Sequence, residues 1–266
     1  MITDSYDNDR TPLLTPQDTL SDTVKQAAEQ APLDTVLLVF SNRLIQKLQE
    51  RGEIEELSPQ VLLGDASARH PVFRVRGTDI GILLSGIGGA SAAGNAEELR
   101  VLFPLKNLFL FGSCGTLTDL KEGSLIVPEK AYRDEGTSYH YAPASDYIDI
   151  PQAETLRSIF DQLEIPYISG NTWTTDAFYR ETSAKRDRLV SEGCVCVEME
   201  CASVQAVCTY YGVNFFPFFY SADSLHSTWT RRILGDKEQS ASLAAFHAAV
   251  SAAGILQERM HSSGSE

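Results

Sequence analysis

Three carboxylates stand directly after two strongly apolar segments of the chain. Glu198 and Glu200 follow the β-prone run 195–197, and Asp223 follows the apolar run 213–220. Strands this uniformly apolar are usually buried on both faces, as in a parallel α/β sheet. Ligands of such sheets bind outside the carboxyl ends of the strands. We therefore expect the three carboxylates to share one ligand-binding edge.

Two Gly/Ser loops follow two further apolar runs. Residues 86–91 read GIGGAS after the run 80–85, and residues 112–115 read GSCG after the run 108–111. Glycine lets the backbone approach a ligand closely, and the amides at a helix start attract anions. A plain tight turn is the alternative for each loop alone. Together the two loops predict a site for a small anion or for sugar hydroxyls.

Two polar segments that contain aromatic rings are further candidates. Residues 132–143 (YRDEGTSYHYAP) form a long irregular stretch of a kind that is often functional, with an ordinary surface loop as the alternative. Residues 171–182 (NTWTTDAFYRET) mix rings with hydroxyls, which suits stacking on a planar base. For Trp173 a place in the core is an equal alternative.

Composition narrows the class of protein. A chain of 266 residues with 43% hydrophobic and 22% charged residues suits a soluble globular protein. The net charge of −14 disfavours nucleic acid and anionic membranes as partners, but it allows one anion in a local pocket. No uninterrupted apolar run approaches ~20 residues, and the acidic N-terminus is unlike a signal peptide. We expect a cytoplasmic protein.

Cysteine and histidine show no metal-binding pattern. The five cysteines are an odd number, and their spacing fits no zinc or redox motif. The five histidines are scattered without ligand spacing. We therefore expect reduced, structural thiols, no metal and no organic cofactor.

The order of apolar and amphipathic segments predicts a single-domain α/β fold. Residues 1–31 are expected to form a polar N-terminal arm, and residues 32–260 a catalytic domain with a central mixed, largely parallel sheet between helices, in three α/β/α layers. Strands are expected near 35–40, 72–76, 80–85, 107–112, 124–127, 165–170, 195–197 and 213–220. Helices are expected near 42–51, 89–101, 152–163, 181–192, 199–210 and 238–258.

These motifs, in this order, resemble the nucleoside phosphorylase superfamily over residues 35 to 235. That superfamily contains purine nucleoside phosphorylases, uridine phosphorylases and the methylthioadenosine/adenosylhomocysteine nucleosidases. The two glycine loops are similar to its first glycine loop and its phosphate loop, and DEGTSYHYAP at 134–143 is close to the uridine phosphorylase version. The most specific match is VEMECAS at 197–203, which resembles the ribose motif.

The resemblance implies a role for each matching residue. Glu200 would accept hydrogen bonds from the ribose hydroxyls, Met199 would pack under the sugar, and Glu198 would frame the pocket. Asp223 would act on the base as a general acid, positioned by Arg231 or Arg232. The other implied contacts are Phe178, Tyr179, Cys114 and Gly115 with the base, and Gly88, Arg43, Ser113 and Arg69 with phosphate.

The chain departs from the superfamily pattern at the phosphate site. Leu110 stands where phosphorylases usually carry an arginine, and the early glycine-aspartate-proline loop is replaced by residues 39–43, which retain only Arg43. Loss of a bidentate arginine removes charge that would hold a dianion, and nucleosidases that use water also lack this arginine. The pyrimidine-reading insert of uridine phosphorylases is absent as well.

Four functions therefore compete. A purine-type nucleoside phosphorylase with phosphate as co-substrate is favoured, because Asp223 matches the aspartate of purine-specific members. The alternatives are a nucleosidase that uses water, supported by Leu110, a uridine phosphorylase, supported by residues 134–143, and a silent nucleoside-binding protein. The expected partners are a nucleoside, phosphate and further copies of the chain, in a dimer or hexamer with sites at subunit interfaces.

Overall fold

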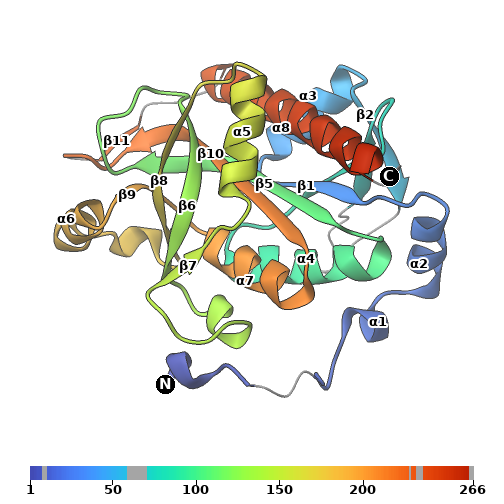
Figure 1. The fold of residues 1–266 in the computed structure, drawn as a ribbon, viewed down its shortest axis with the longest axis horizontal. Helices are drawn as coiled ribbons and strands as arrows, with labels where there is room; N and C mark the ends of the chain where they lie inside the picture. Colours follow the sequence, from blue (N-terminus) through green and yellow to red (C-terminus); the bar gives the residue numbers. More distant parts are fainter. Residues whose placement is uncertain (8–10, 59–70, 228, 232–235, 264–266) are drawn as a thin grey trace.

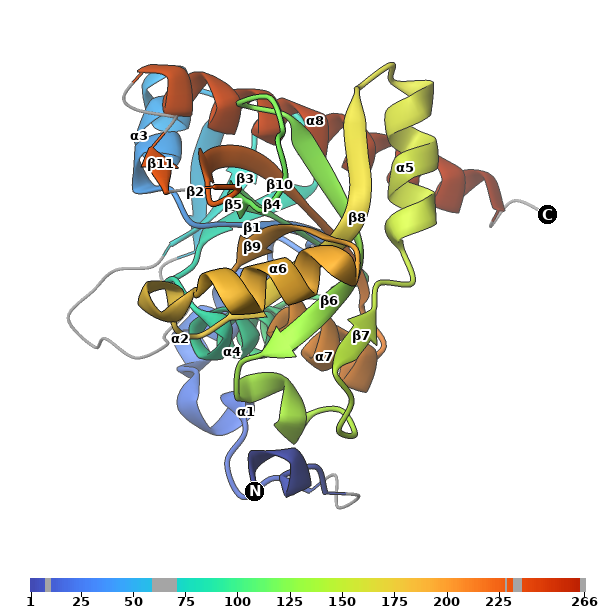
Figure 2. The same cartoon turned by 90° about the vertical axis from the view of Figure 1, so that its left-hand side faces the viewer.

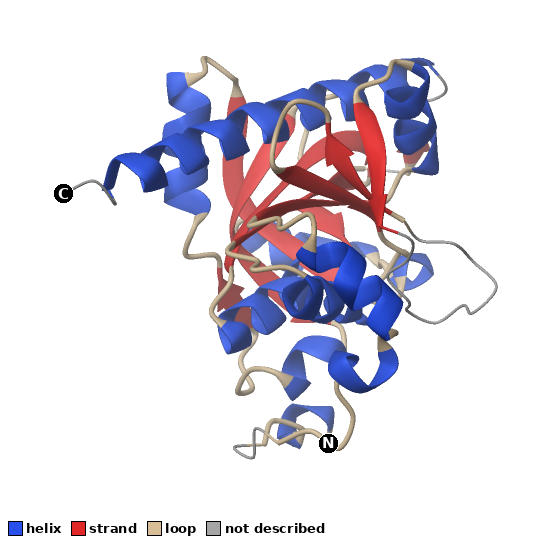
Figure 3. Cartoon of the chain, turned by 90° about the vertical axis from the view of Figure 1, so that its right-hand side faces the viewer, coloured by secondary structure: helices blue, strands red, loops and turns tan. Residues whose placement is uncertain are grey.

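The computed structural model of the protein describes residues 1–7, 11–58, 71–227, 229–231 and 236–263. Their strands form one sheet between two layers of helices (Figures 1 and 3). The strands are β1 (Thr35–Val39), β2 (Ile54–Ser58), β3 (Val72–Val75), β4 (Ile80–Leu84), β5 (Asn107–Thr116), β6 (Leu125–Asp134), β7 (Tyr147–Asp149), β8 (Tyr167–Thr175), β9 (Cys194–Glu198), β10 (Asn214–Ser224) and β11 (Thr230–Arg231). The helices are α1 (Pro16–Thr19), α2 (Asp22–Glu29), α3 (Asn42–Glu50), α4 (Gly89–Leu102), α5 (Ala153–Gln162), α6 (Ser183–Ser191), α7 (Cys201–Tyr211) and α8 (Asp236–Ser263), with short 3₁₀ turns η1 (Ile2–Asp4), η2 (Thr137–His140) and η3 (Phe178–Arg180).

The sheet is mixed, as predicted. Strand β1 pairs in parallel with β4 and β5, β5 pairs in parallel with β10, and β8 pairs in parallel with β6 and β9. Antiparallel pairs join β9 to β5 and β10 to β6. Because β1, β5 and β10 run in the same direction, their carboxyl ends meet at one edge, and β9 brings its own carboxyl end beside them.

A ladder of phenylalanines holds the centre of the sheet together. The rings of Phe109 and Phe216 stack with centroids 4.8 Å apart, and those of Phe111 and Phe218 stack at 5.4 Å. Phe160 of α5 meets Phe218 edge-on at 5.3 Å. These rings are buried, so β5 and β10 form a rigid pair that fixes the position of the loops beyond them.

The helices cover the two faces of the sheet (Figure 1). Helices α4 and α7 pack together on one face, whereas α3, α5 and α8 lie on the other. The stretch Gln239–Arg259 of α8 is long and apolar enough to cross a membrane by length and composition, although its apolar residues are not continuous. In this structure Phe246 and Ala249 of α8 are buried in the core, and the helix contacts β5 and β10, as a core helix does.

Every strand and helix expected from the sequence is present. The sequence did not predict the short strands β2, β7 and β11, and it underestimated the lengths of β5, β6, β8 and β10. The division into an arm of residues 1–31 and one domain of residues 32–260 stays a prediction. Within residues 1–31, Val24 and Ala28 of α2 are buried and belong to the main core.

A buried carboxyl in α4 makes stability depend on pH. The side chain of Glu98 is 3% exposed, and no described donor reaches its Oε2 atom. Burial raises the pKa of Glu98 to about 7, above the value of roughly 4.3 in an unfolded chain. The stabilising contribution of the protonated form is therefore complete below about pH 4.3 and is lost as the pH rises to 7.

We expect Glu98→Gln to stabilise the protein at alkaline pH, because the amide stays neutral. The gain over wild type should grow by roughly 2–3 kcal/mol between pH 4.5 and pH 8. Urea denaturation across this range measures it. The exposed Glu154→Gln in α5 is the control and should show no such trend. A constant difference between Glu98→Gln and wild type would show that Glu98 is ionised in the folded protein.

Candidate active site

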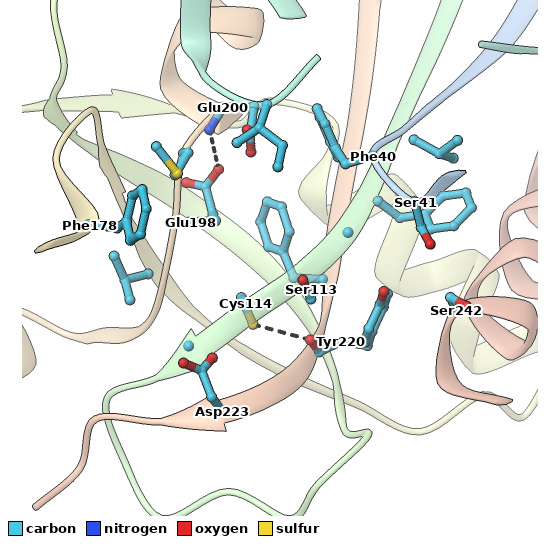
Figure 4. A pocket seen from close by; sticks show the side chains of 18 of the residues that line it. Phe40, Ser41, Ser113, Cys114, Phe178, Glu198, Glu200, Tyr220, Asp223 and Ser242 are labelled. Atoms are coloured by element: carbon cyan, nitrogen blue, oxygen red, sulfur yellow. Dashed lines mark hydrogen bonds between the residues drawn. The ribbon is translucent and has the colours of Figure 1, made fainter. Parts of the chain in front are cut away.

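A cavity of about 890 Å³ lies at the carboxyl ends of β1, β5, β9 and β10 (Figure 4). It collects most of the residues that the sequence predicted. Those that line it are Arg43, Ser113, Cys114, Gly115, Phe178, Tyr179, Glu198, Met199, Glu200 and Asp223. Figure 4 shows that Phe178 and Asp223 lie at one end of the cavity and Phe40 and Ser242 at the other. The cavity is therefore long enough to have distinct ends.

The other predicted site residues are Gly88, Arg231, Arg69 and Arg232, and of these Gly88 does not line the cavity. Gly88 lies behind Glu200 and contacts it through its backbone. Arg231 lies directly opposite Asp223 in the antiparallel pairing of β10 with β11. Arg69 and Arg232 lie outside the described residues. The proposed roles of Arg69, Arg231 and Arg232 stay predictions.

Glu198 is bound by the chain itself. Its Oε2 accepts hydrogen bonds from the backbone N–H groups of Glu200 and Cys201, both at 2.7 Å, and its Oε1 accepts from the hydroxyls of Thr172 and Thr174. The carboxylate thus satisfies the free amides at the start of α7 and ties that helix to β8. Burial raises the pKa of Glu198 to about 7, although the four donors act in the opposite direction. Glu198 frames the cavity by fixing α7.

Glu200 is the carboxylate with acceptor capacity to spare. Its side chain is 6% exposed, and its Oε1 accepts one hydrogen bond, of 2.6 Å, from the backbone N–H of Gly88. Burial, and then the nearby charge of Glu198, raise the pKa of Glu200 to about 8. A carboxylate offers about four lone-pair positions, so Glu200 can accept from two neighbouring hydroxyls of a ligand as well.

The first glycine loop allows this contact by its backbone geometry. Gly88 has a φ of 102°, a conformation that other residues rarely adopt. The next residue, Gly89, begins α4, and a Cβ atom there would lie only 2.2 Å from the Ser203 hydroxyl of α7. Glycine at both positions lets α4 pack closely on α7 and directs the Gly88 N–H to Glu200. The loop therefore supports the carboxylate that lines the cavity.

Aromatic rings and Asp223 form the end of the cavity that lies away from Phe40 and Ser242. The rings of Phe178 and Tyr179 lie 4.0 Å apart, and the two side chains are 48% and 88% exposed. Asp223 accepts a hydrogen bond of 2.9 Å at Oδ2 from the indole N–H of Trp229. A Cβ atom on Gly115 would lie 3.4 Å from Oδ1 of Asp223, so glycine leaves room beside that oxygen. This end suits a planar base.

Sequence analysis missed two residues at this end, Glu181 and Trp229, which both line the cavity. Burial, and then the charge of Asp223, raise the pKa of Glu181 to about 7. Glu181 belongs to the segment 171–182, in which the aromatic rings and hydroxyls were the features that indicated a base site. Nothing in the sequence around Trp229 indicates that its ring reaches Asp223.

The end where an anion was expected has few charged groups. Leu110 is fully buried in β5, and the Phe40 ring lies against Gly112, with Cδ2 of Phe40 3.1 Å from where a Cβ atom would stand. Arg43 at the start of α3 is exposed and is the one arginine or lysine that lines the cavity in the described part of the chain. The hydroxyls of Ser113, Ser41 and Ser242 and the first turn of α3 are further polar groups that line the cavity.

The segment 132–143 is structural. None of its residues lines the cavity. Glu135 is buried and accepts hydrogen bonds from the hydroxyls of Ser138 and Ser203, so it ties the segment to α7. Trp173 of β8 is fully buried and donates to Asp134, which places it in the core. Because none of these residues lines the cavity, the segment would not contact a ligand bound in the cavity of the same chain.

The described residues contain no group of three or more His, Cys, Asp or Glu side chains that could hold a metal ion. All five cysteines are free and buried. Burial raises the pKa of the Cys114 thiol, which lines the cavity, well above its usual value. A neutral thiol is a poor nucleophile, so Cys114 contributes shape to the cavity.

Comparison with known proteins shows which family the chain belongs to. The sequence profile of the Phosphorylase superfamily matches residues 34–256. The chain belongs to the Phosphorylase superfamily. Similar superfamily proteins include purine nucleoside phosphorylases of the DeoD type from Bacillus cereus (strain ZK / E33L) and Bacillus thuringiensis (strain Al Hakam), each 27% identical over 143 residues. That stretch is 52% of this chain and 61% of each relative, so the match spans less than two thirds of their length.

Solved structures of the superfamily share the fold. An AMP nucleosidase from Bacteroides thetaiotaomicron has a TM-score of 0.70 and 18% identity, covering 92% of this chain and all of that one. A purine nucleoside phosphorylase from Toxoplasma gondii has a TM-score of 0.71 and 18% identity, covering 90% and 99%. A uridine phosphorylase from Vibrio fischeri has a TM-score of 0.66 and 22% identity, covering 84% and 92%. The likeness confirms the predicted fold, and the three activities differ.

Proposed function

We propose that the protein cleaves the N-glycosidic bond of a purine nucleoside. The proposal rests mainly on Glu200. Its buried side chain accepts one hydrogen bond from the Gly88 N–H, and it lines a cavity that has aromatic rings at one end. Two vicinal sugar hydroxyls are donors of the right kind for its remaining lone pairs. Met199 lines the same wall and gives the sugar an apolar surface.

The proposed mechanism follows from the charges that develop during cleavage. The sugar gains oxocarbenium character, which Glu200 stabilises in its ionised form, while the leaving base gains negative charge. The rings of Phe178 and Tyr179 hold the base by stacking. A proton delivered to the base at the Asp223 end of the cavity relieves its charge, which is general acid catalysis worth typically ~10²–10⁴-fold.

A purine base is favoured over uracil. Asp223 reaches the base end of the cavity, where a carboxyl can interact with a purine ring nitrogen. The sequence feature that favoured uridine is the segment 134–143. It lies outside the cavity, and its Glu135 contacts α7. The similar DeoD-type relatives are purine nucleoside phosphorylases, which supports the same preference.

Phosphate is the proposed nucleophile, and it would give free base and ribose 1-phosphate as products. Arg43, the Ser113 hydroxyl and the first turn of α3 are the groups that would hold it. Water is the second candidate, because Leu110 stands in place of an arginine and Arg43 is the one described lysine or arginine that lines the cavity. No metal or organic cofactor enters the proposal.

We also propose that the protein acts as a cytoplasmic homo-oligomer, a dimer or a hexamer. Apolar side chains at the mouth of the cavity support this proposal: Ile87 is 69% exposed and Trp229 is 64% exposed. Covering them with another copy of the chain would remove apolar surface from water beside the site.

Base release with and without phosphate tests the nucleophile. With inosine as substrate, we expect hypoxanthine and ribose 1-phosphate in phosphate buffer, and little base in a buffer free of phosphate. Arg43→Ala should raise the KM for phosphate more than the KM for inosine. Equal rates in both buffers, with ribose as product, would make the protein a nucleosidase. Inosine binding without base release in either buffer would contradict glycosidic cleavage.

A further inference from the structure

Glu181 lies in the cavity beside the predicted base platform. It directly follows η3, which carries Phe178 and Tyr179, and it precedes α6. Its side chain is half-buried and lines the same cavity as Asp223, close enough for the charge of Asp223 to act on it. The base end therefore contains two carboxyls on different elements, where the sequence had indicated one.

Asp223 is held in place by the segment that follows β10. The Trp229 indole N–H donates to Oδ2 of Asp223 at 2.9 Å, and an indole nitrogen can only donate, so this oxygen serves as an acceptor. Arg186 of α6 donates from Nη1 to the carbonyl oxygens of Leu225 at 2.9 Å and Ser227 at 3.2 Å. These contacts fix the start of the connection that carries Trp229, and Trp229 fixes one oxygen of Asp223.

The surroundings of the two carboxyls indicate which of them holds a proton that it can donate. Burial raises the pKa of Glu181 to about 7, and the negative charge of Asp223 adds to this effect. Two cations of α6 are engaged elsewhere: Arg186 pairs with Asp187 at 2.7 Å and donates to the two carbonyls, and Lys185 pairs with Asp134 at 2.8 Å. Glu181 is therefore the carboxyl that can donate a proton, and Asp223 is the carboxyl that accepts a hydrogen bond from Trp229.

We propose, on the basis of the proposed glycosidic cleavage, that Glu181 is the catalytic acid that protonates the leaving base and that Asp223 is the positioning residue that keeps the proton on Glu181. As the bond from C1′ to the base nitrogen breaks, its electron pair goes to the base, which takes the carboxyl proton of Glu181. The oxygen of phosphate or water forms the new bond to C1′. The proton that this nucleophile gives up to solvent restores Glu181, because the cavity is open to water.

This assignment predicts that the role of Glu181 depends on the leaving group. Inosine releases a base that must be protonated, so its cleavage needs the acid. The base of 7-methylguanosine already carries a positive charge and leaves without taking a proton. A residue with a merely structural role would affect both substrates alike.

The test compares Glu181→Gln with wild type on these two probes in phosphate buffer. We expect kcat on inosine to fall by roughly 10²-fold or more and kcat on 7-methylguanosine to stay within about threefold. In the wild type, the ratio of the inosine rate to the 7-methylguanosine rate should decline above about pH 7, where Glu181 loses its proton, and this decline should be absent from Glu181→Gln. Asp223→Asn should shift the decline to lower pH, because it removes the charge that keeps the proton on Glu181. Glu154→Gln is the control for loss of one exposed carboxylate.

Three results would overturn the assignment. Glu181→Gln could slow both probes equally, it could leave inosine cleavage unchanged, or the loss confined to inosine could occur in Asp223→Asn instead. A wild-type protein that releases base from neither probe would contradict the proposed function itself, an outcome that no Glu181 variant can imitate.

Discussion

Glu200→Gln is expected to lower kcat/KM for purine ribonucleosides by about 10²–10³-fold. A carboxylate that accepts from two ribose hydroxyls contributes roughly 1.5–3 kcal/mol for each charge-assisted hydrogen bond, and tenfold in rate corresponds to about 1.4 kcal/mol. The amide keeps an acceptor for the Gly88 N–H but turns its NH₂ group, a donor, toward the sugar. It also removes the negative charge that stabilises the oxocarbenium-like sugar. Initial rates over a range of substrate concentrations measure the effect.

Two controls accompany this prediction: a substrate with a different sugar, and the unfolding temperature of the variant. A 2′-deoxynucleoside lacks one of the two donors, so the same substitution should cost it clearly less than it costs the ribonucleoside. The variant should also unfold at no lower temperature than wild type at pH 8, because Glu200, with a pKa raised to about 8, is costly to ionise in the folded protein. Equal losses for both sugars would remove Glu200 from the ribose site.

Phe218→Ala is expected to destabilise the protein by roughly 3–5 kcal/mol, the usual range for a fully buried phenylalanine. The Phe218 ring is 0% exposed, stacks on Phe111 and receives the edge of Phe160. Its removal leaves a cavity between α5 and the β5–β10 pair, whose carboxyl ends carry the site. Urea denaturation should show a lower midpoint.

Two substitutions make this prediction specific. Phe218→Leu fills part of the space and should cost less than half as much as Phe218→Ala. Phe178→Ala, which changes the same residue type at a 48% exposed position, should leave the free energy of unfolding within about 0.5 kcal/mol while weakening base binding. If Phe178→Ala destabilised the protein as much as Phe218→Ala, the ring of Phe178 would belong to the core and could not serve as a base platform.

The part of the site that could be predicted depended on local patterns. Apolar runs that end in 112–115, 198–200 and 223 place those residues at one edge, because the carboxyl ends of parallel strands meet. The structure brings them to one cavity, but the argument holds only for 112–115 and 223, because β5 and β10 are parallel whereas β9 pairs antiparallel with β5. The strands that were missed are short or polar: β2 reads IEELS, and β11 has two residues. Neither has a hydrophobic pattern long enough to be recognised.

The rest of the site depends on contacts between distant segments. Glu135 was predicted to lie in a functional loop, but its partner Ser203 is 68 positions away and makes the loop a support for α7. Trp229 reaches Asp223 only because the chain turns back after β10, as Figure 2 shows for β10 and β11. Glu198 looked like a ligand-binding group, and its four internal donors became apparent only with β8 and α7 in place.

The most direct measurement of the central claim is the release of free base from a panel of nucleosides by the purified wild-type protein in phosphate buffer. The panel contains inosine, adenosine, guanosine, uridine and methylthioadenosine, and the products are separated and quantified. Our account predicts release of a purine base at a rate well above that of uracil. Faster release of uracil, or tight binding of every nucleoside with no base released, would contradict it.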